Sequence, residues 1–147
     1  MWTARQFHDI YIINLGTGER RQIKEKSPSY MRFSPKGKYT YWYQDQDSSW
    51  YTRSTADGKE YRLTTPQTFA AWDEDNDVPD YPSPYGIAGW TDDDQSILIK
   101  DRYDIWKFDP IAASSPVNLT VNGRKEQITY SLIQLDREKR AYNTSEA

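Results

Sequence analysis

The sequence predicts an all-β protein, built as a partial β-propeller with about two whole four-stranded antiparallel blades and parts of two more. Short apolar runs are separated throughout by Gly, Pro, Asp and Ser, as is typical of strands joined by tight turns. Aromatic residues make up 15% of the 147 residues, and large aromatic side chains favour strands. The runs recur at a spacing of about 40 residues, which is the period of propeller blades.

The first two predicted units are the outer hairpin of a blade at residues 1–25 and a whole blade at residues 26–64. In the hairpin, a strand at 9–15 and a returning strand at 20–23 flank the turn 16–18, whose glycines can adopt positive φ. The blade begins with an apolar-polar run and a Ser-Pro-Lys-Gly-Lys turn. Its predicted strands are residues 30–33, 39–43, 50–53 and 61–64.

The next units are an inserted loop at 65–86, a second blade at 87–120, and the start of another blade at 121–147. The loop holds an acidic run and several prolines, and loops longer than about 15 residues are usually functional or disordered. Its prolines and aromatic residues favour an ordered loop draped over the surface. The strands of the second blade are predicted at 87–90, 96–99, 104–108 and around Val117 and Leu119.

The repeat is visible as matched residues in successive units. The number of residues between matched positions differs from pair to pair because the inserted loop lengthens one unit. The pairs are Gly18 with Gly58 at a difference of 40, Phe33 with Trp90 at 57, Leu63 with Leu119 at 56, and Leu135 with Phe33 at 102.

Composition excludes several classes of function. The net charge of −3 gives a nucleic-acid partner no electrostatic support. No apolar run approaches the roughly 18 residues of a transmembrane helix, so no membrane partner is predicted. The absence of cysteine removes disulfides and thiolate chemistry. The first residues lack a signal-peptide pattern and lead abruptly into a strand, so we expect a fragment of a longer protein.

The predicted binding residues lie in the inserted loop and at its exit. Residues 73–77 place carboxylate or amide oxygens at alternate positions, as calcium loops do, but the mid-loop Gly and late Glu of an EF-hand are missing. A solvated acidic loop is the alternative. No metal and no cofactor are predicted. The binding residues are Trp72, Asp73, Asp75, Asp77, Tyr81 and Tyr85.

The aromatic residues allow two interpretations. They could form a surface that binds a sugar or a peptide, or they could pack between blades, which need large side chains to fill a wedge. Packing is the commoner role of such residues. The aromatic residues outside the loop to which this applies are Trp42, Tyr43, Trp50 and Tyr51.

No catalytic residue is predicted. His8 is the only histidine, and it lies at the start of a strand near the N-terminus. The chain contains no Gly-x-Ser-x-Gly nucleophile elbow. The glycines of the turn 16–18 belong to a hairpin and not to a strand-to-helix nucleotide loop.

Three segments together make up one repeat pattern: residues 9–18 (DIYIINLGTG), residues 33–39 (FSPKGKY) and Leu63-Thr64. This pattern resembles the repeat of TolB-type propellers. It also resembles the N-terminal propeller of prolyl oligopeptidase and dipeptidyl peptidase IV-type serine peptidases. The repeat spans nearly the whole chain.

A second block consists of residues 84–91 (PYGIAGWT), 101–110 (DRYDIWKFDP) and 116–124 (PVNLTVNGR). It is similar to the propeller of bacterial peptidases of the prolyl oligopeptidase family. In that family the propeller caps a separate α/β-hydrolase domain that carries the Ser-Asp-His triad. The resemblance therefore implies a non-catalytic part of such an enzyme, and no catalytic residue is carried over.

We therefore expect a propeller segment that gates or positions peptide substrates for a hydrolase domain absent from this chain. The expected partners are that peptide substrate, the neighbouring blades, and further copies of the chain, because cut blade edges are adhesive. The resemblance alone favours an exported or periplasmic location. Two alternatives stay open: a TolB-like binding or scaffold propeller with no enzymatic partner domain, and a carbohydrate-cleaving propeller that uses loop carboxylates.

Overall fold

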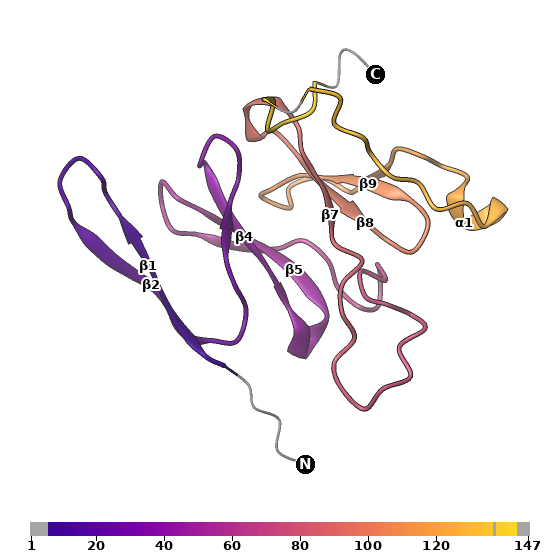
Figure 1. The fold of residues 1–147 in the computed structure, drawn as a ribbon, viewed down its shortest axis with the longest axis horizontal. Coiled ribbons are helices and arrows are strands. Elements are labelled where there is room, and N and C mark those ends of the chain that lie inside the picture. Colours follow the sequence, from indigo (N-terminus) through magenta and orange to yellow (C-terminus); the bar gives the residue numbers. More distant parts are fainter. Residues whose placement is uncertain (1–5, 137, 144–147) are drawn as a thin grey trace.

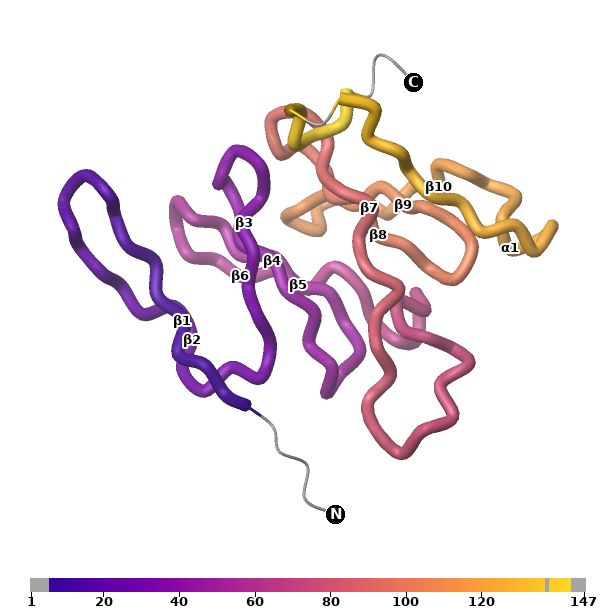
Figure 2. The backbone as a smooth tube through the Cα atoms, viewed as in Figure 1, coloured from indigo at the N-terminus to yellow at the C-terminus, as the bar shows by residue number. Residues whose placement is uncertain are grey.

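The computed structural model describes residues 6–136 and 138–143, and over these residues the protein is all-β, as predicted. The described strands form three antiparallel sheets that follow one another along the chain (Figure 1, Figure 2). No helix in this part of the chain is long and apolar enough to span a bilayer. The hairpin consists of β1 (His8–Ile13) and β2 (Arg20–Ser27); the first sheet of β3 (Arg32–Phe33), β4 (Tyr39–Gln44), β5 (Ser49–Ser54) and β6 (Glu60–Arg62); the second sheet of β7 (Ile87–Trp90), β8 (Ile97–Lys100), β9 (Ile105–Phe108) and β10 (Val117–Asn118).

Both four-stranded sheets are meanders, in which each strand pairs with its neighbour in sequence. The last strand of each sheet is shorter than the sequence predicts. A threonine hydroxyl takes over as acceptor beyond it: Trp50 N–H donates to Thr64 Oγ1 at 2.9 Å, and Ile105 N–H donates to Thr120 Oγ1 at 3.1 Å. In both sheets, a threonine hydroxyl therefore replaces a backbone carbonyl as the acceptor at the end of the last strand.

The first hairpin of each sheet closes with the same hydrogen bonds. Ser34 N–H donates to the Tyr39 carbonyl at 2.9 Å, and Tyr39 N–H donates back to the Ser34 hydroxyl at 3.0 Å. In the second sheet, Thr91 N–H donates to the Ser96 carbonyl at 3.0 Å, and Ser96 N–H donates to the Thr91 hydroxyl at 2.9 Å. The pattern recurs at the offset of 57 residues that the sequence predicts.

The turn between β1 and β2 matches the turn between β5 and β6. Gly18 N–H donates to the Asn14 carbonyl at 2.7 Å, and Gly58 N–H donates to the Ser54 carbonyl at 2.9 Å. The φ angles of the two glycines are 72° and 74°, a region that favours glycine. These bonds recur at the predicted offset of 40 residues, so the hairpin resembles the outer half of the first sheet.

The core lies between the two four-stranded sheets. Alternation along β4 directs Tyr41 toward the second sheet, where its ring centroid lies 5.5 Å from that of Trp90. Trp42 points to the opposite face, where the Lys24 ammonium of β2 lies 4.2 Å from its ring centroid. One face of the first sheet therefore meets the second sheet, and the other meets the hairpin. The buried core residues are Tyr41, Trp50, Phe69, Ala71, Trp90, Ile97, Ile99 and Phe108.

A buried carboxylate joins the corresponding turns of the two sheets. Asp94, only 2% exposed, belongs to η2 (Asp92–Asp94) in the β7–β8 turn. It accepts hydrogen bonds from the Ser34 hydroxyl at 2.5 Å and from the backbone N–H groups of Lys36 and Lys38 at 3.1 Å. Since these donors all belong to the β3–β4 turn, the predicted polar turn 92–94 also acts as the clamp between the sheets.

The inserted loop is ordered, because its two ends are held together and its first part enters the core. Trp72 and Pro84 form an antiparallel bridge, and Tyr85 N–H donates to the Ala71 carbonyl at 3.0 Å. Phe69 packs edge-on against Phe108, with ring centroids 5.2 Å apart. The loop therefore leaves the core at Ala71 and returns at Tyr85.

The strands predicted within residues 121–147 are absent from the residues described there. These residues form α1 (Gly123–Glu126) and then cross the second sheet as irregular chain. A strand needs a continuous ladder of backbone hydrogen bonds. This segment instead meets the second sheet at separate points, where Tyr130 N–H donates to the Tyr103 carbonyl and Tyr142 N–H donates to the Trp90 carbonyl. Residue 137, within the predicted turn at Leu135, and residues 144–147 lie outside the described residues.

We expect Asp94→Asn to lower the free energy of unfolding by about 2–3 kcal/mol, because an amide replaces charge-assisted acceptance and turns an NH₂ group toward buried donors. Urea denaturation measures the effect. Asp93→Asn is the matched control: Asp93 is exposed and pairs with Lys38 at the surface, so the midpoint of this variant should stay close to that of the parent. Equal midpoints for the two variants would contradict the role of Asp94.

Candidate functional site

The structure brings only part of the predicted binding set together. Asp73 caps the start of the loop tip by accepting a hydrogen bond from Asp75 N–H at 3.1 Å. The Tyr85 hydroxyl accepts one from Glu74 N–H at 2.9 Å. Trp72 is half-buried in the bridge at the base of the loop. Asp77 and Tyr81 lie apart from these residues on the exposed tip.

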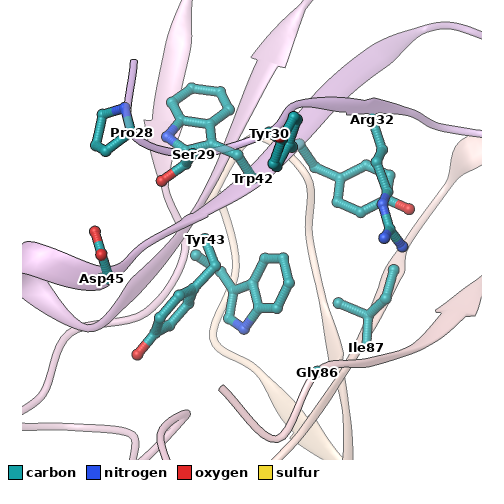
Figure 3. A pocket seen from close by; sticks show the side chains of 11 residues that line it. Pro28, Ser29, Tyr30, Arg32, Trp42, Tyr43, Asp45, Gly86 and Ile87 are labelled. Atoms are coloured by element: carbon teal, nitrogen blue, oxygen red, sulfur yellow. The ribbon is translucent and has the colours of Figure 1, made fainter. Parts of the chain in front are cut away.

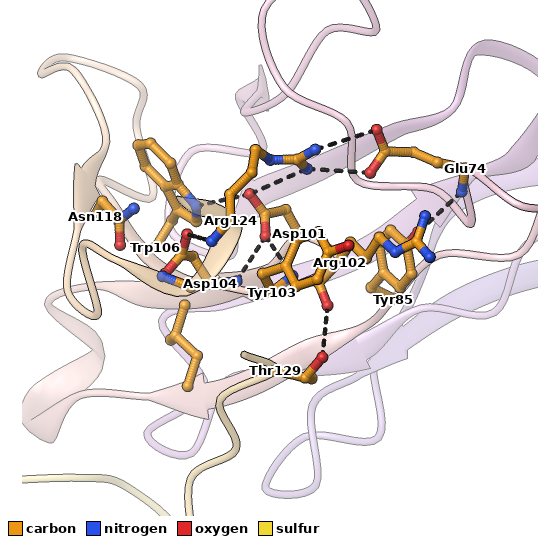
Figure 4. A network of polar contacts seen from close by, with 12 residues as sticks. Glu74, Tyr85, Asp101, Arg102, Tyr103, Asp104, Trp106, Asn118, Arg124 and Thr129 are labelled. Atoms are coloured by element: carbon orange, nitrogen blue, oxygen red, sulfur yellow. Dashed lines mark hydrogen bonds and ion pairs between the residues drawn. The ribbon is translucent and has the colours of Figure 1, made fainter. Parts of the chain in front are cut away.

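Two arginines hold the acidic part of the loop. Arg102 reaches Asp75 at 2.6 Å. Arg124 reaches Glu74 at 3.1 Å (Figure 4). Both guanidinium groups also lie over the Tyr103 ring, at 5.3 and 5.4 Å from its centroid. We call Glu74, Asp75, Arg102, Tyr103 and Arg124 the arginine clasp. The ion pairs of Asp75 and Glu74 with these arginines attach the loop to the second sheet.

Behind the clasp, two buried aspartates organise the backbone. Asp101 accepts from Asp104 N–H at 2.7 Å and from the Trp106 indole N–H at 3.2 Å. Asp104, 2% exposed, accepts from the Thr120 hydroxyl at 2.6 Å and from the N–H groups of Gly123 and Arg124. Burial alone would raise the pKa of the Asp104 carboxyl, but these hydrogen bonds outweigh burial and hold the pKa below its ordinary value.

The carboxylates of this region are therefore committed to protein donors. Among the described residues, no group of three or more His, Asp or Glu side chains is arranged to hold a metal ion. The arrangement at 73–77 is that of a loop fixed by Asx-type hydrogen bonds and ion pairs. The clasp carboxylates hold the loop in position, and a space of about 360 Å³ lies beside Glu74, Asp101 and Arg124.

A pocket of about 490 Å³ opens where the first sheet meets the start of β7 (Figure 3). Its wall is aromatic, and its two charged groups are Arg32 and Asp45. Pockets of about 300–1,000 Å³ with apolar walls and a few polar groups are typical of small-ligand sites. We call it the aromatic pocket; its lining residues are Pro28, Ser29, Tyr30, Arg32, Tyr41, Trp42, Tyr43, Asp45, Trp50, Gly86 and Ile87.

Two donor groups belong to residues that line this pocket. The Trp50 indole N–H is buried and has no hydrogen-bond acceptor within the described ranges. The Arg32 guanidinium lies beside the Tyr41 hydroxyl and forms no ion pair with a described carboxylate. Burial raises the pKa of that hydroxyl although Arg32 partly opposes the shift, so Tyr41 remains a hydrogen-bond donor at neutral pH.

Both interpretations of the aromatic residues therefore hold in part. Trp42 and Trp50 are buried at 1% and 7% exposure, as packing residues are, yet each contributes an edge to the pocket wall. The sequence did not indicate Pro28, Tyr30 or Arg32 as site residues. They come from the connection before β3 and meet β7 only in the folded chain, so no local motif marks them.

We expect Asp104 to contribute to the acid dependence of stability. Its folded-state pKa is depressed, so its contribution is complete above the unfolded value near 4 and is lost as the pH falls through the folded value. Unfolding free energy measured from about pH 6 down to pH 2 should fall less steeply in Asp104→Asn than in the parent. Parallel curves would contradict the role of Asp104.

We expect the double variant Arg102→Gln/Arg124→Gln to release the loop tip. Limited proteolysis within residues 73–83 should become about two- to fivefold faster, and salt near 1 M should approach the same rate in the parent. Lys125→Gln is the control, since Lys125 lies on the same helix and forms no ion pair with a described residue. Unchanged cleavage in the double variant would show that the loop is held by its base alone.

Comparisons with known proteins give no match: no family model, no curated protein and no solved structure is similar to this chain. Arguments about function therefore depend on the geometry and chemistry of the aromatic pocket and the arginine clasp.

Proposed function

We propose that the chain is a non-catalytic segment of a β-propeller that binds short peptides in the aromatic pocket and positions them for a hydrolase domain absent from this chain. The observation that carries the proposal is the pocket itself, an aromatic-walled site that contains an arginine and lies between two sheets of the same topology.

Three features support the two sheets as consecutive blades. Both are four-stranded meanders, they close with the same hydrogen bonds 57 residues apart, and they bury a shared aromatic layer between them. The hairpin supplies a third unit on the other face of the first sheet, where the Arg53 guanidinium donates to the Ile23 carbonyl at 3.4 Å. Exposed apolar side chains, Ile133 at 78% and Leu135 at 92%, suit a further neighbour beyond the second sheet.

The chemistry of the pocket supports a peptide as the ligand. Aromatic faces accept apolar side chains, while the Arg32 guanidinium can donate to main-chain carbonyl groups. The pocket lies at the start of β3 and β7, the first strand of each sheet. In a propeller the first strands surround the central channel, through which a short peptide could reach a domain capped by the blades.

The role for a separate hydrolase domain is taken from the resemblance to prolyl oligopeptidase-type propellers. A TolB-like propeller that only binds would use the same pocket. Peptide turnover by the full-length protein separates the two, because the binding propeller alone would return its ligand unchanged.

We expect Tyr30→Ala to weaken peptide binding about three- to tenfold without changing the melting temperature, because Tyr30 is 70% exposed and lines the pocket. Binding of a panel of tri- and tetrapeptides, each with one aromatic residue and a free or amidated C-terminus, is followed by tryptophan fluorescence.

Tyr81→Ala is the matched control, since Tyr81 is an exposed tyrosine on the loop tip and does not line the pocket. It should bind as the parent does. A loss of binding in Tyr81→Ala alone would move the site to the inserted loop, and a panel with no saturable ligand would overturn the proposal.

A further inference from the structure

We infer that the aromatic pocket recognises the free C-terminal carboxylate of a short peptide, with Arg32 holding the carboxylate and the tyrosine and tryptophan wall holding an aromatic terminal side chain. This inference rests on the proposed function, because it names the end of the peptide that the pocket takes.

Arg32 lines the pocket, and its guanidinium forms no ion pair with a carboxylate of residues 6–136 or 138–143. It lies on β3, the edge strand of the first sheet, and is paired in register with Tyr41. Figure 3 shows its side chain extending toward Ile87, on the far wall of the pocket. Four other arginines are paired: Arg53 with Glu60, Arg62 with Asp47, Arg102 with Asp75 and Arg124 with Glu74.

The surroundings of Arg32 suit a carboxylate more than a neutral acceptor. A guanidinium presents a planar fork that matches the two oxygens of a carboxylate. The Tyr41 hydroxyl beside it remains protonated at neutral pH and adds a second donor. Apolar atoms of Ile87 and Tyr41 line the same end of the pocket, and partial desolvation strengthens a charge pair there.

The opposite end of the pocket gives the ligand a direction. Asp45 lines the pocket on the far side of the aromatic wall from Arg32 (Figure 3). Its negative charge repels a carboxylate at that end and disfavours ligands with several negative charges. A terminal carboxylate near Arg32, with the rest of the peptide running toward Asp45, is the arrangement that matches both charges.

The test compares two N-acetylated tripeptides, Ala-Ala-Phe with a free carboxylate and the same sequence with a C-terminal amide. In the parent protein the acid should bind at least about tenfold more tightly than the amide, as expected for a charge-assisted pair. Arg32→Gln should bind both forms with the weaker affinity, and Arg32→Lys should retain part of the preference. Tyr30→Ala should weaken both forms by the same factor, because it removes wall area and no charge.

Arg124→Gln is the control and should keep the full preference, since Arg124 belongs to the arginine clasp and not to the pocket. Equal affinity of acid and amide in the parent would overturn the carboxylate inference while leaving peptide binding intact. An unchanged preference in a folded Arg32→Gln variant would overturn the role of Arg32. If neither peptide nor any other member of the panel binds, the proposed function fails with it. Displacement of the acid by inorganic phosphate at equal concentration would overturn selectivity for a carboxylate.

Discussion

The shared aromatic layer can be buried only if the two four-stranded sheets meet in one register, and the Asp94 carboxylate fixes that register. A layer of large rings tolerates sliding, because apolar contact is non-directional. Three hydrogen bonds to one buried carboxylate do not, since a shift of one residue would leave buried donors without an acceptor. The hydrogen bonds to Asp94 are directional, so they fix how the two sheets are aligned where apolar contact alone would not.

The aromatic pocket and the arginine clasp both lie at edges of the interface between the two sheets. Beside the start of β7, Tyr43 and Trp50 pack against the core and also line the pocket. Where the chain leaves β6, Phe69 and Ala71 fill the gap between the sheets, so the loop that follows must emerge beside the β8–β9 turn. There Arg102 and Arg124 meet it.

The sequence was sufficient to predict elements whose cause is local. Short runs of apolar and aromatic residues between turns placed β4, β7 and β9 nearly at their observed bounds, and the glycines Gly18 and Gly58, which adopt positive φ, marked the recurring turn. The candidate site depends on long-range geometry and was predicted less well. The acidic run looked like a ligand site because its arginine partners lie about 27 and 50 residues away in sequence. No local motif marked Arg32, since its place in the pocket depends on neighbours that are distant in sequence.

The turns joined by Asp94 occupy equivalent places in their sheets yet differ in chemistry. The turn of the first sheet contributes only donors, through Ser34 and two backbone N–H groups, and the turn of the second contributes the acceptor. Two units of the same topology could in principle be exchanged along the chain without changing the fold. If the two sheets were exchanged, the Asp94 carboxylate and the donors of the β3–β4 turn would no longer face each other. The units are therefore not interchangeable modules, and their order along the chain follows from the polarity of a single contact.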